Sequence, residues 1–169
     1  MIKIIKYLFE ALVIYLFFII IKIAGLSASR ILFSSIFKKI GPIIRSNDII
    51  KKNLNIFSNN LSEKNKNEIE QNMWTNYGKT FVEYMFLKKF RKENFHVTIK
   101  GKKILDEIYL KKKPVIFVSG HFANFELMSM EITKNKINLA TIYRPLNNFF
   151  LNPLMEYLRK KYVCENQIK

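Results

Sequence analysis

A histidine and a glutamate follow a short apolar run in the second half of the chain. The run at residues 115–119 is followed by Gly120 and His121, and Glu126 comes five residues after the histidine. A carboxylate that bonds one ring nitrogen fixes the imidazole tautomer and stabilises the imidazolium, which leaves the other nitrogen to take a proton from an alcohol. The HxxxxE spacing therefore predicts a general base that activates a hydroxyl for direct attack on an acyl carbonyl.

The segments around this pair alternate between short apolar runs and helical patterns. Strands are expected at residues 95–99, 115–119 and 137–143, each followed by a helix, and residues 162–169 read as the beginning of another strand. Asn152 and Pro153 form a cap and first-turn pair for the last helix. Strands and helices at such short spacing require crossover connections, so the predicted fold is α/β with a partial, mostly parallel sheet in residues 93–169.

In such a sheet, ligands bind at the carboxyl ends of the strands, where His121 and Arg144 are expected. If their strands are neighbours, Arg144 lies close to His121 and can hold a phosphate or carboxylate. The helix that opens at residues 123–125 could leave backbone N–H groups for a developing oxyanion.

Simpler interpretations compete with this chemistry. A bare HxxxxE is more often a capped helix with a core histidine, and His96 reads as an exposed or locally bonded strand residue. No HExxH pair or third ligand is evident, so no metal site is predicted. Cys164 is the single cysteine, which excludes an intramolecular disulfide, and neither histidine lies near it in sequence.

The N-terminal 26 residues are expected to anchor the chain in a membrane. Residues 7–26 are long and apolar enough to cross a hydrocarbon core, with Glu10 and Lys22 toward their ends. A signal peptide is the competing interpretation, although residues 24–26 make a poor cleavage site. More basic residues follow the apolar segment than precede it, which favours a single anchor with a cytoplasmic C-terminal body.

Residues 27–92 are expected to form amphipathic helices, the first of them at a membrane surface. Ser46 or Asn47 is expected to cap a helix that ends near Phe57, and Ser62 a longer helix that ends near Phe90. In the longer helix, a core stripe recurs every four residues at Ile69, Met73, Tyr77, Phe81 and Met85. Gly78 interrupts this helix, which predicts a close packing contact there.

The chain is strongly basic, with 29 Lys and Arg against 13 Asp and Glu, a net charge of +16 and a pI near 9.9. Such a balance attracts nucleic acid, acidic phospholipid or phosphorylated glycolipid. No compact basic tract with interleaved aromatic residues stands out, so nucleic acid is not a predicted partner.

Two sequence blocks resemble a known family. Residues 120–126, GHFANFE, resemble the GHxGNWE-type block of the bacterial lipid A late acyltransferases, the lauroyl and myristoyl transferases of lipopolysaccharide assembly. Residues 143–148, YRPLNN, resemble the YRPLDN block that follows it in that family. The N-terminal anchor, the basic amphipathic helices and the segment MWTNYGKTFVEY stand in the family's order, so the resemblance covers essentially the whole chain.

The resemblance implies a bacterial inner-membrane enzyme with a glycerolipid-acyltransferase-like fold. It implies transfer of a fatty acyl chain from acyl carrier protein to a hydroxyl of a Kdo-bearing lipid A precursor, with no cofactor besides that acyl donor. His121 matches the catalytic base and Glu126 its carboxylate partner. Arg144 matches a substrate-contacting position, and Asn124, grouped with it as substrate-binding, is expected to support the turn. The implied partners are acyl carrier protein, an anionic glycolipid acceptor and the membrane.

The sequence departs from the family pattern at Ala123, Phe125 and Asn147, where the family has glycine, tryptophan and aspartate. The family's chain also continues into further acceptor-binding blocks, so this sequence is expected to be an N-terminal portion. Two alternative functions stay open at this point. One is acyl transfer to a lysophospholipid or another glycolipid, and the other is a truncated, non-catalytic membrane-bound remnant.

Overall fold

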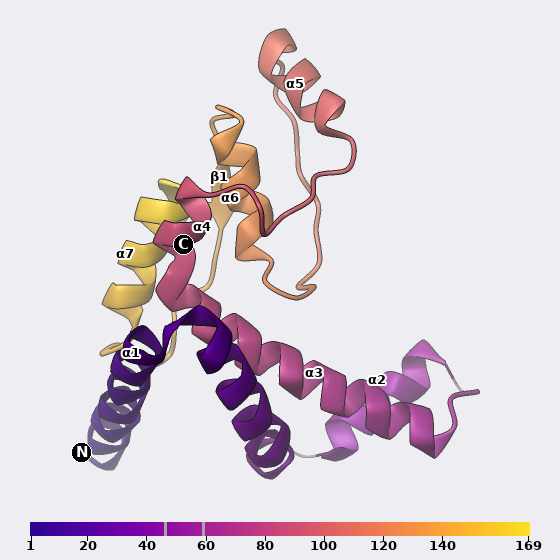
Figure 1. Cartoon of the computed structure of the whole chain (residues 1–169), viewed down its shortest axis with the longest axis vertical. Coiled ribbons are helices and arrows are strands. Elements are labelled where there is room, and N and C mark those ends of the chain that lie inside the picture. Colours follow the sequence, from indigo (N-terminus) through magenta and orange to yellow (C-terminus); the bar gives the residue numbers. More distant parts are fainter. Residues whose placement is uncertain (46, 59) are drawn as a thin grey trace. The chain divides into compact units, whose positions relative to one another are not determined.

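The computed structural model describes residues 1–45, 47–58 and 60–169 and is mostly helical (Figure 1). The chain divides into two compact units. Unit 1 comprises Met1–Ile19 and Phe86–Lys169, and unit 2 comprises Ile20–Met85. By role, the chain is expected to divide into an anchor (1–26), an amphipathic helical region (27–92) and a partial α/β domain (93–169). The division into compact units does not test these roles, so the three segments stay a prediction.

Helix α1 (Ile2–Ile44) contains the expected anchor and is one helix long and apolar enough to span a membrane. Its most apolar 18-residue window has a mean hydropathy of 2.4, and only 17 % of that window is buried, unlike most core helices of soluble proteins. The backbone leaves the helical region at Gly25, with φ 78° and ψ 173°, a conformation that residues with a Cβ rarely adopt. The length and composition of α1 thus weakly support a membrane anchor.

Unit 2 packs the C-terminal part of α1 against α3 (Glu63–Glu83), with α2 (Asn47–Phe57) between them in the chain. A Cβ built on Gly78 would lie 2.4 Å from the carbonyl oxygen of Phe33, which confirms the expected close packing. The Ser62 hydroxyl accepts a hydrogen bond from the Asn65 N–H at 3.2 Å, as expected for the cap of α3. Of the two candidate caps for α2, Ser46 lies outside the described residues, and Asn47 is already the first residue of the helix.

The prediction of the core stripe on α3 is wrong, because the buried positions are displaced from it by one residue. The buried positions are Glu70, Trp74, Gly78 and Val82, together with Glu83 next to the last of them, whereas Tyr77 is 55 % exposed. The first four of these positions also recur every four residues. A pattern of apolar side chains does not mark them, because one is a glutamate and another is a glycine. In addition, α3 ends at Glu83, and a 3-10 turn, η1 (Tyr84–Phe86), separates it from α4 (Leu87–Lys92), so the single helix expected to reach Phe90 is broken.

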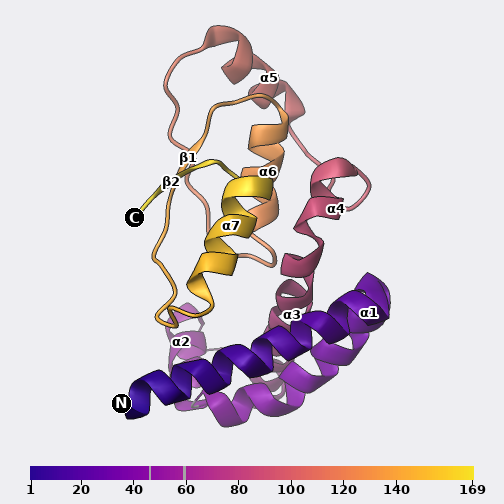
Figure 2. The same ribbon diagram turned by 90° about the vertical axis from the view of Figure 1, so that its left-hand side faces the viewer.

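Unit 1 is built around α4, α6 (Glu126–Lys134) and α7 (Asn152–Tyr162) (Figure 2). Helix α4 contacts both other helices. Their buried apolar side chains are Leu87, Phe90, Met130, Ile132 and Leu158. Pro153 lies in the first turn of α7 as expected, but the cap position is Leu151, and Asn152 is already helical.

The sheet consists of β1 (Ala140–Ile142) and β2 (Asn166–Ile168), which pair in parallel with Ala140 opposite Asn166. Helix α7 lies between them in the chain, so the structure confirms a crossover connection and the strand expected in the last residues. Both strands have only three residues, and the wider α/β acyltransferase sheet stays a prediction.

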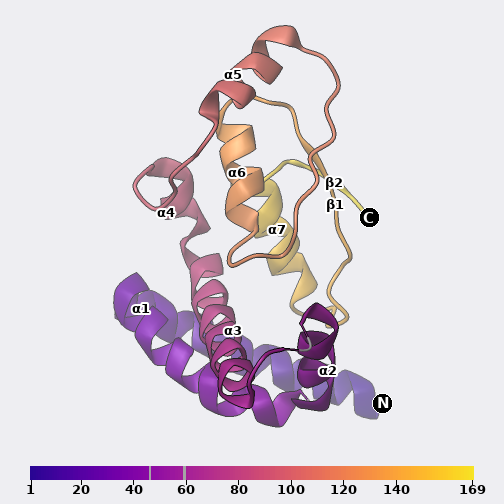
Figure 3. The same ribbon diagram turned by 90° about the vertical axis from the view of Figure 1, so that its right-hand side faces the viewer.

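Two expected strands, residues 95–99 and 115–119, are not strands in the structure. Residues 112–122 form an extended trace from α5 (Lys102–Lys111) to α6 (Figure 3), with Ile116 and Val118 90 % and 91 % exposed. An extended segment becomes a strand only when a neighbour takes its backbone hydrogen bonds. Within the described residues, β1 pairs with β2 alone, so these segments have no such neighbour.

Candidate active site

His121 lies in the short loop that leads into α6, and its side chain is exposed. Its imidazole contacts the ring of Phe125 edge-on, with 4.2 Å between the ring centroids. The ring is therefore positioned by an aromatic neighbour and open to solvent, a placement in which a substrate hydroxyl can reach it.

The loop around His121 is compact. The Phe122 N–H donates to the Gly120 carbonyl at 2.9 Å, and a Cβ on Gly120 would lie 2.6 Å from the Phe122 ring. Ala123 takes a left-handed conformation with φ 47°, which is the position where the family pattern has glycine. Asn124 is 9 % exposed, and its backbone carbonyl accepts the Leu127 N–H at 3.2 Å. The support of the turn by the Asn124 side chain and its binding of substrate both stay predictions.

Glu126 begins α6 and is only 5 % exposed. Its Oε1 accepts a hydrogen bond from Nε of Arg159 on α7 at 2.7 Å. The guanidinium of Arg159 also lies over the ring of Tyr143, 5.8 Å from the centroid. Arg159 was not expected from the sequence, because it is 33 residues away from Glu126 and no local motif marks it.

The structure does not join His121 to Glu126. Among the described residues, no hydrogen bond or ion pair links the two side chains, and the carboxylate is instead held by Arg159. The expected pair of base and carboxylate therefore stays a prediction.

Arg144 lies two residues past the end of β1, as expected, and its side chain is exposed. The expectation that neighbouring strands bring it beside His121 is not met by the sheet, since β1 pairs with β2 and residues 115–119 form no strand. A substrate-contacting role for Arg144 stays a prediction.

The second block is fixed through Asn148, which is 8 % exposed. Its Nδ2 donates to the Tyr7 carbonyl at 2.9 Å and to Oε2 of Glu10 at 3.3 Å, and its Oδ1 accepts the Phe150 N–H at 3.1 Å. These bonds tie the loop after β1 to the first turns of α1. Glu10, one of the two charged residues of the expected anchor, thus has a partner within the protein.

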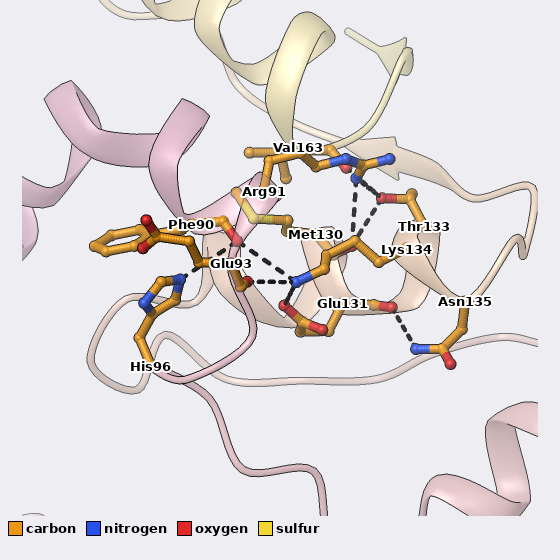
Figure 4. A network of polar contacts seen from close by, with 10 residues as sticks. All are labelled: Phe90, Arg91, Glu93, His96, Met130, Glu131, Thr133, Lys134, Asn135 and Val163. Atoms are coloured by element: carbon orange, nitrogen blue, oxygen red, sulfur yellow. Dashed lines mark hydrogen bonds and ion pairs between the residues drawn. The ribbon is translucent and has the colours of Figure 1, made fainter.

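A polar network holds α6 against α4 (Figure 4). Nζ of Lys134 donates to the Glu93 carbonyl at 2.9 Å and the Phe90 carbonyl at 3.4 Å, while it pairs with Glu131 at 2.8 Å. His96 shares the Phe90 carbonyl at 3.3 Å, which confirms a local bond for this histidine. A cation at the C-terminal carbonyls of α4 satisfies groups that the helix leaves unpaired. The network fixes α6, the helix that Glu126 begins.

An apolar hollow of about 900 Å³ lies beside β1. It is lined by the segment before His121 and by α5, α6 and β1, with Tyr109, Phe117, Met128 and Ile132 among its walls. Its walls suit an apolar ligand better than a polar one. In the part of the chain that the structure describes, no group of three or more His, Cys, Asp or Glu side chains is placed to hold a metal ion.

Comparison with known proteins decides the family. The profile of the bacterial lipid A biosynthesis acyltransferase family matches residues 2–165. The chain belongs to this family. The match includes both blocks and confirms the resemblance seen in the sequence, and membership supports an acyltransferase role. No curated protein and no solved structure gives a significant match.

Proposed function

We propose that this member of the lipid A acyltransferase family transfers a fatty acyl group from acyl carrier protein to a hydroxyl of a Kdo-bearing lipid A precursor. The observation that carries the proposal is the family match over residues 2–165. The exposed imidazole of His121, next to a helix that begins with a buried carboxylate, supports it.

In the proposed reaction, a ring nitrogen of His121 takes the proton of the acceptor hydroxyl as the oxygen attacks the thioester carbonyl. The C–S bond of the resulting tetrahedral intermediate then breaks, and the thiolate of the carrier receives the proton from the imidazolium. The products are the ester and the free carrier thiol. No covalent acyl-enzyme is needed.

Glu126 is proposed to stabilise the imidazolium in this reaction. The exposed His121 side chain has to turn from Phe125 toward the carboxylate when substrate binds, while Arg159 holds the carboxylate in place. The positive end of the helix dipole of α6 favours a developing oxyanion at this end of the helix, where the N–H groups of Leu127 and Met128 already donate to the Asn124 and Phe125 carbonyls.

Substrate placement follows from charge and shape. The apolar hollow beside β1 suits a fatty acyl chain, and the exposed Arg144 suits a phosphate of the acceptor. A net charge of +16 favours an acidic carrier and an anionic lipid. With α1 as its anchor, the protein is proposed to act at the cytoplasmic face of the bacterial inner membrane.

The test is acyl transfer in membranes that contain this chain, lauroyl- or myristoyl-loaded carrier and a Kdo-lipid A precursor. His121→Ala is expected to lower the rate by about two to four orders of magnitude. His96→Gln is the matched control, since it replaces the other histidine of the chain, keeps a side chain that can bond the Phe90 carbonyl and should leave the rate unchanged. Equal rates for the parent and His121→Ala would overturn the mechanism. Preferential transfer to an added lysophospholipid would reassign the acceptor.

A further inference from the structure

Unit 2 contains a pocket of about 480 Å³ that belongs to neither sequence block. Lys38, Lys39 and Pro42 of α1 line it together with Glu70, Gln71 and Trp74 of α3. Its volume is within the range of small-molecule sites in proteins, roughly 300–1,000 Å³.

Two buried polar atoms of this pocket have no hydrogen-bond partner among the described residues. They are Oε1 of Glu70 and Nε1 of Trp74. Glu70 is 7 % exposed and Trp74 is 8 % exposed. The two residues lie four positions apart and therefore on the same face of α3. Burial of an unpaired carboxylate oxygen and an unpaired indole N–H is costly, so a ligand that satisfies both is strongly favoured.

The pocket also carries two cations. Lys38 and Lys39 are exposed at its wall, and within residues 1–45, 47–58 and 60–169 neither ammonium lies within ion-pair distance of Glu70. A complementary ligand must therefore combine an ammonium group with N–H donors for Glu70 and an anionic acceptor for Trp74 and the lysines. A primary amine joined to a phosphate has both features.

We propose that this pocket binds the phosphoethanolamine headgroup of a membrane phospholipid. The ammonium pairs with Glu70, and the phosphate accepts from the Trp74 indole and faces Lys38 and Lys39. A lipid is favoured over a free metabolite because the pocket is formed in part by the segment of α1 that follows Gly25, and this segment continues directly from the expected anchor of residues 7–26. This binding is independent of the proposed acyl transfer, and either one can fail without the other.

Trp74 is the only tryptophan of the chain, so its fluorescence reports on the pocket directly. The full chain is titrated with vesicles of phosphatidylcholine that contain increasing phosphatidylethanolamine. A saturable change in Trp74 emission is expected. Vesicles of phosphatidylcholine alone are expected to give little change, because a trimethylammonium group has no N–H to donate. Phosphoethanolamine added to the protein in detergent tests the free compound, and a response as strong as that to phosphatidylethanolamine would overturn the assignment of a lipid.

Glu70→Gln keeps the shape of the side chain and removes its charge, and it is expected to weaken the response about tenfold or more. Replacement of Lys38 and Lys39 by alanine should also weaken the response. The matched control is Glu68→Gln, which changes an exposed carboxylate on α3, the helix of Glu70, and should have no effect. Circular dichroism of each variant verifies that the helices are retained. An equal response to both lipids, or an unchanged response in Glu70→Gln, would overturn the proposal.

Discussion

Glu126 and Arg159 form an ion pair that is shielded from solvent, with 2.7 Å between Oε1 and Nε and side chains 7 % and 14 % exposed. It joins the first residue of α6 to the last turn of α7. Because α6 begins just after the loop of His121, the pair also fixes the end of that loop. A buried pair of this kind holds geometry rather than adding much net stability, since desolvation offsets the attraction between the charges.

The first prediction concerns this pair. Arg159→Gln should lower the free energy of unfolding by about 3–5 kcal/mol, because it leaves the buried Glu126 carboxylate without its cation. The double variant Glu126→Gln/Arg159→Gln should regain much of this loss. Thermal unfolding in detergent, followed by circular dichroism, measures both. Lys160→Gln is the control, since Lys160 is exposed and its pairing with Glu156 at 3.4 Å is screened by solvent and adds little stability. Equal losses at positions 159 and 160 would contradict the assignment.

The second prediction concerns Asn148. Asn148→Ala should lower the free energy of unfolding by about 1–3 kcal/mol, because it removes a buried side chain and leaves its half-buried backbone partners, the Tyr7 carbonyl and the Phe150 N–H, unsatisfied. Asn148→Asp should cost more, since it places a negative charge beside Glu10. The neighbouring Asn147→Asp introduces the family's residue at an exposed position and should stay within about 0.5 kcal/mol of the parent. Denaturant titration of the three variants checks the order, and a neutral Asn148→Asp would refute it.

The sequence predicts those features of unit 1 that depend on local pattern. Alternating strand and helix signals indicate the parallel pairing of β1 with β2, and the position of Arg144 after β1 follows from the same pattern. The expected strand at residues 115–119 fails for a reason outside that segment. Its apolar side chains are typical of a buried strand, but whether it pairs depends on neighbours that the described residues do not supply.

The candidate site was predictable only in its local part. The HxxxxE spacing identifies His121 and Glu126, yet it cannot reveal that a residue 33 positions later would take the carboxylate. That contact depends on how α7 packs against α6, which is a tertiary property. The buried face of α3 was missed for a similar reason, since Glu70 is polar and Gly78 is buried by close approach rather than by its own side chain.

The third prediction concerns the backbone of the His121 loop. Ala123 has φ 47°, and a left-handed conformation costs a residue with a Cβ about 1–2 kcal/mol. Ala123→Gly should raise the free energy of unfolding by about 0.5–1 kcal/mol once the greater freedom of glycine in the unfolded chain is subtracted. Ala140→Gly, in β1, should lower it by about the same amount. A rise in melting temperature for the first variant and a fall for the second is the expected pattern, and a fall in both would show that residue 123 is not strained.

The fourth prediction concerns the contact between α1 and α3 in unit 2. In Gly78→Ala the new Cβ would lie 2.4 Å from the Phe33 carbonyl oxygen and 2.8 Å from the Ser34 Cα, both backbone atoms that cannot move alone. The helix propensity of alanine favours the variant by about 1 kcal/mol. Overpacking costs about 1–3 kcal/mol and should exceed that gain, so the variant should unfold at a lower temperature. Asn72→Ala, at an exposed position of α3, lacks the clash and should be neutral or slightly stabilised. A stabilised Gly78→Ala would mean that the two helices approach less closely than the structure has them.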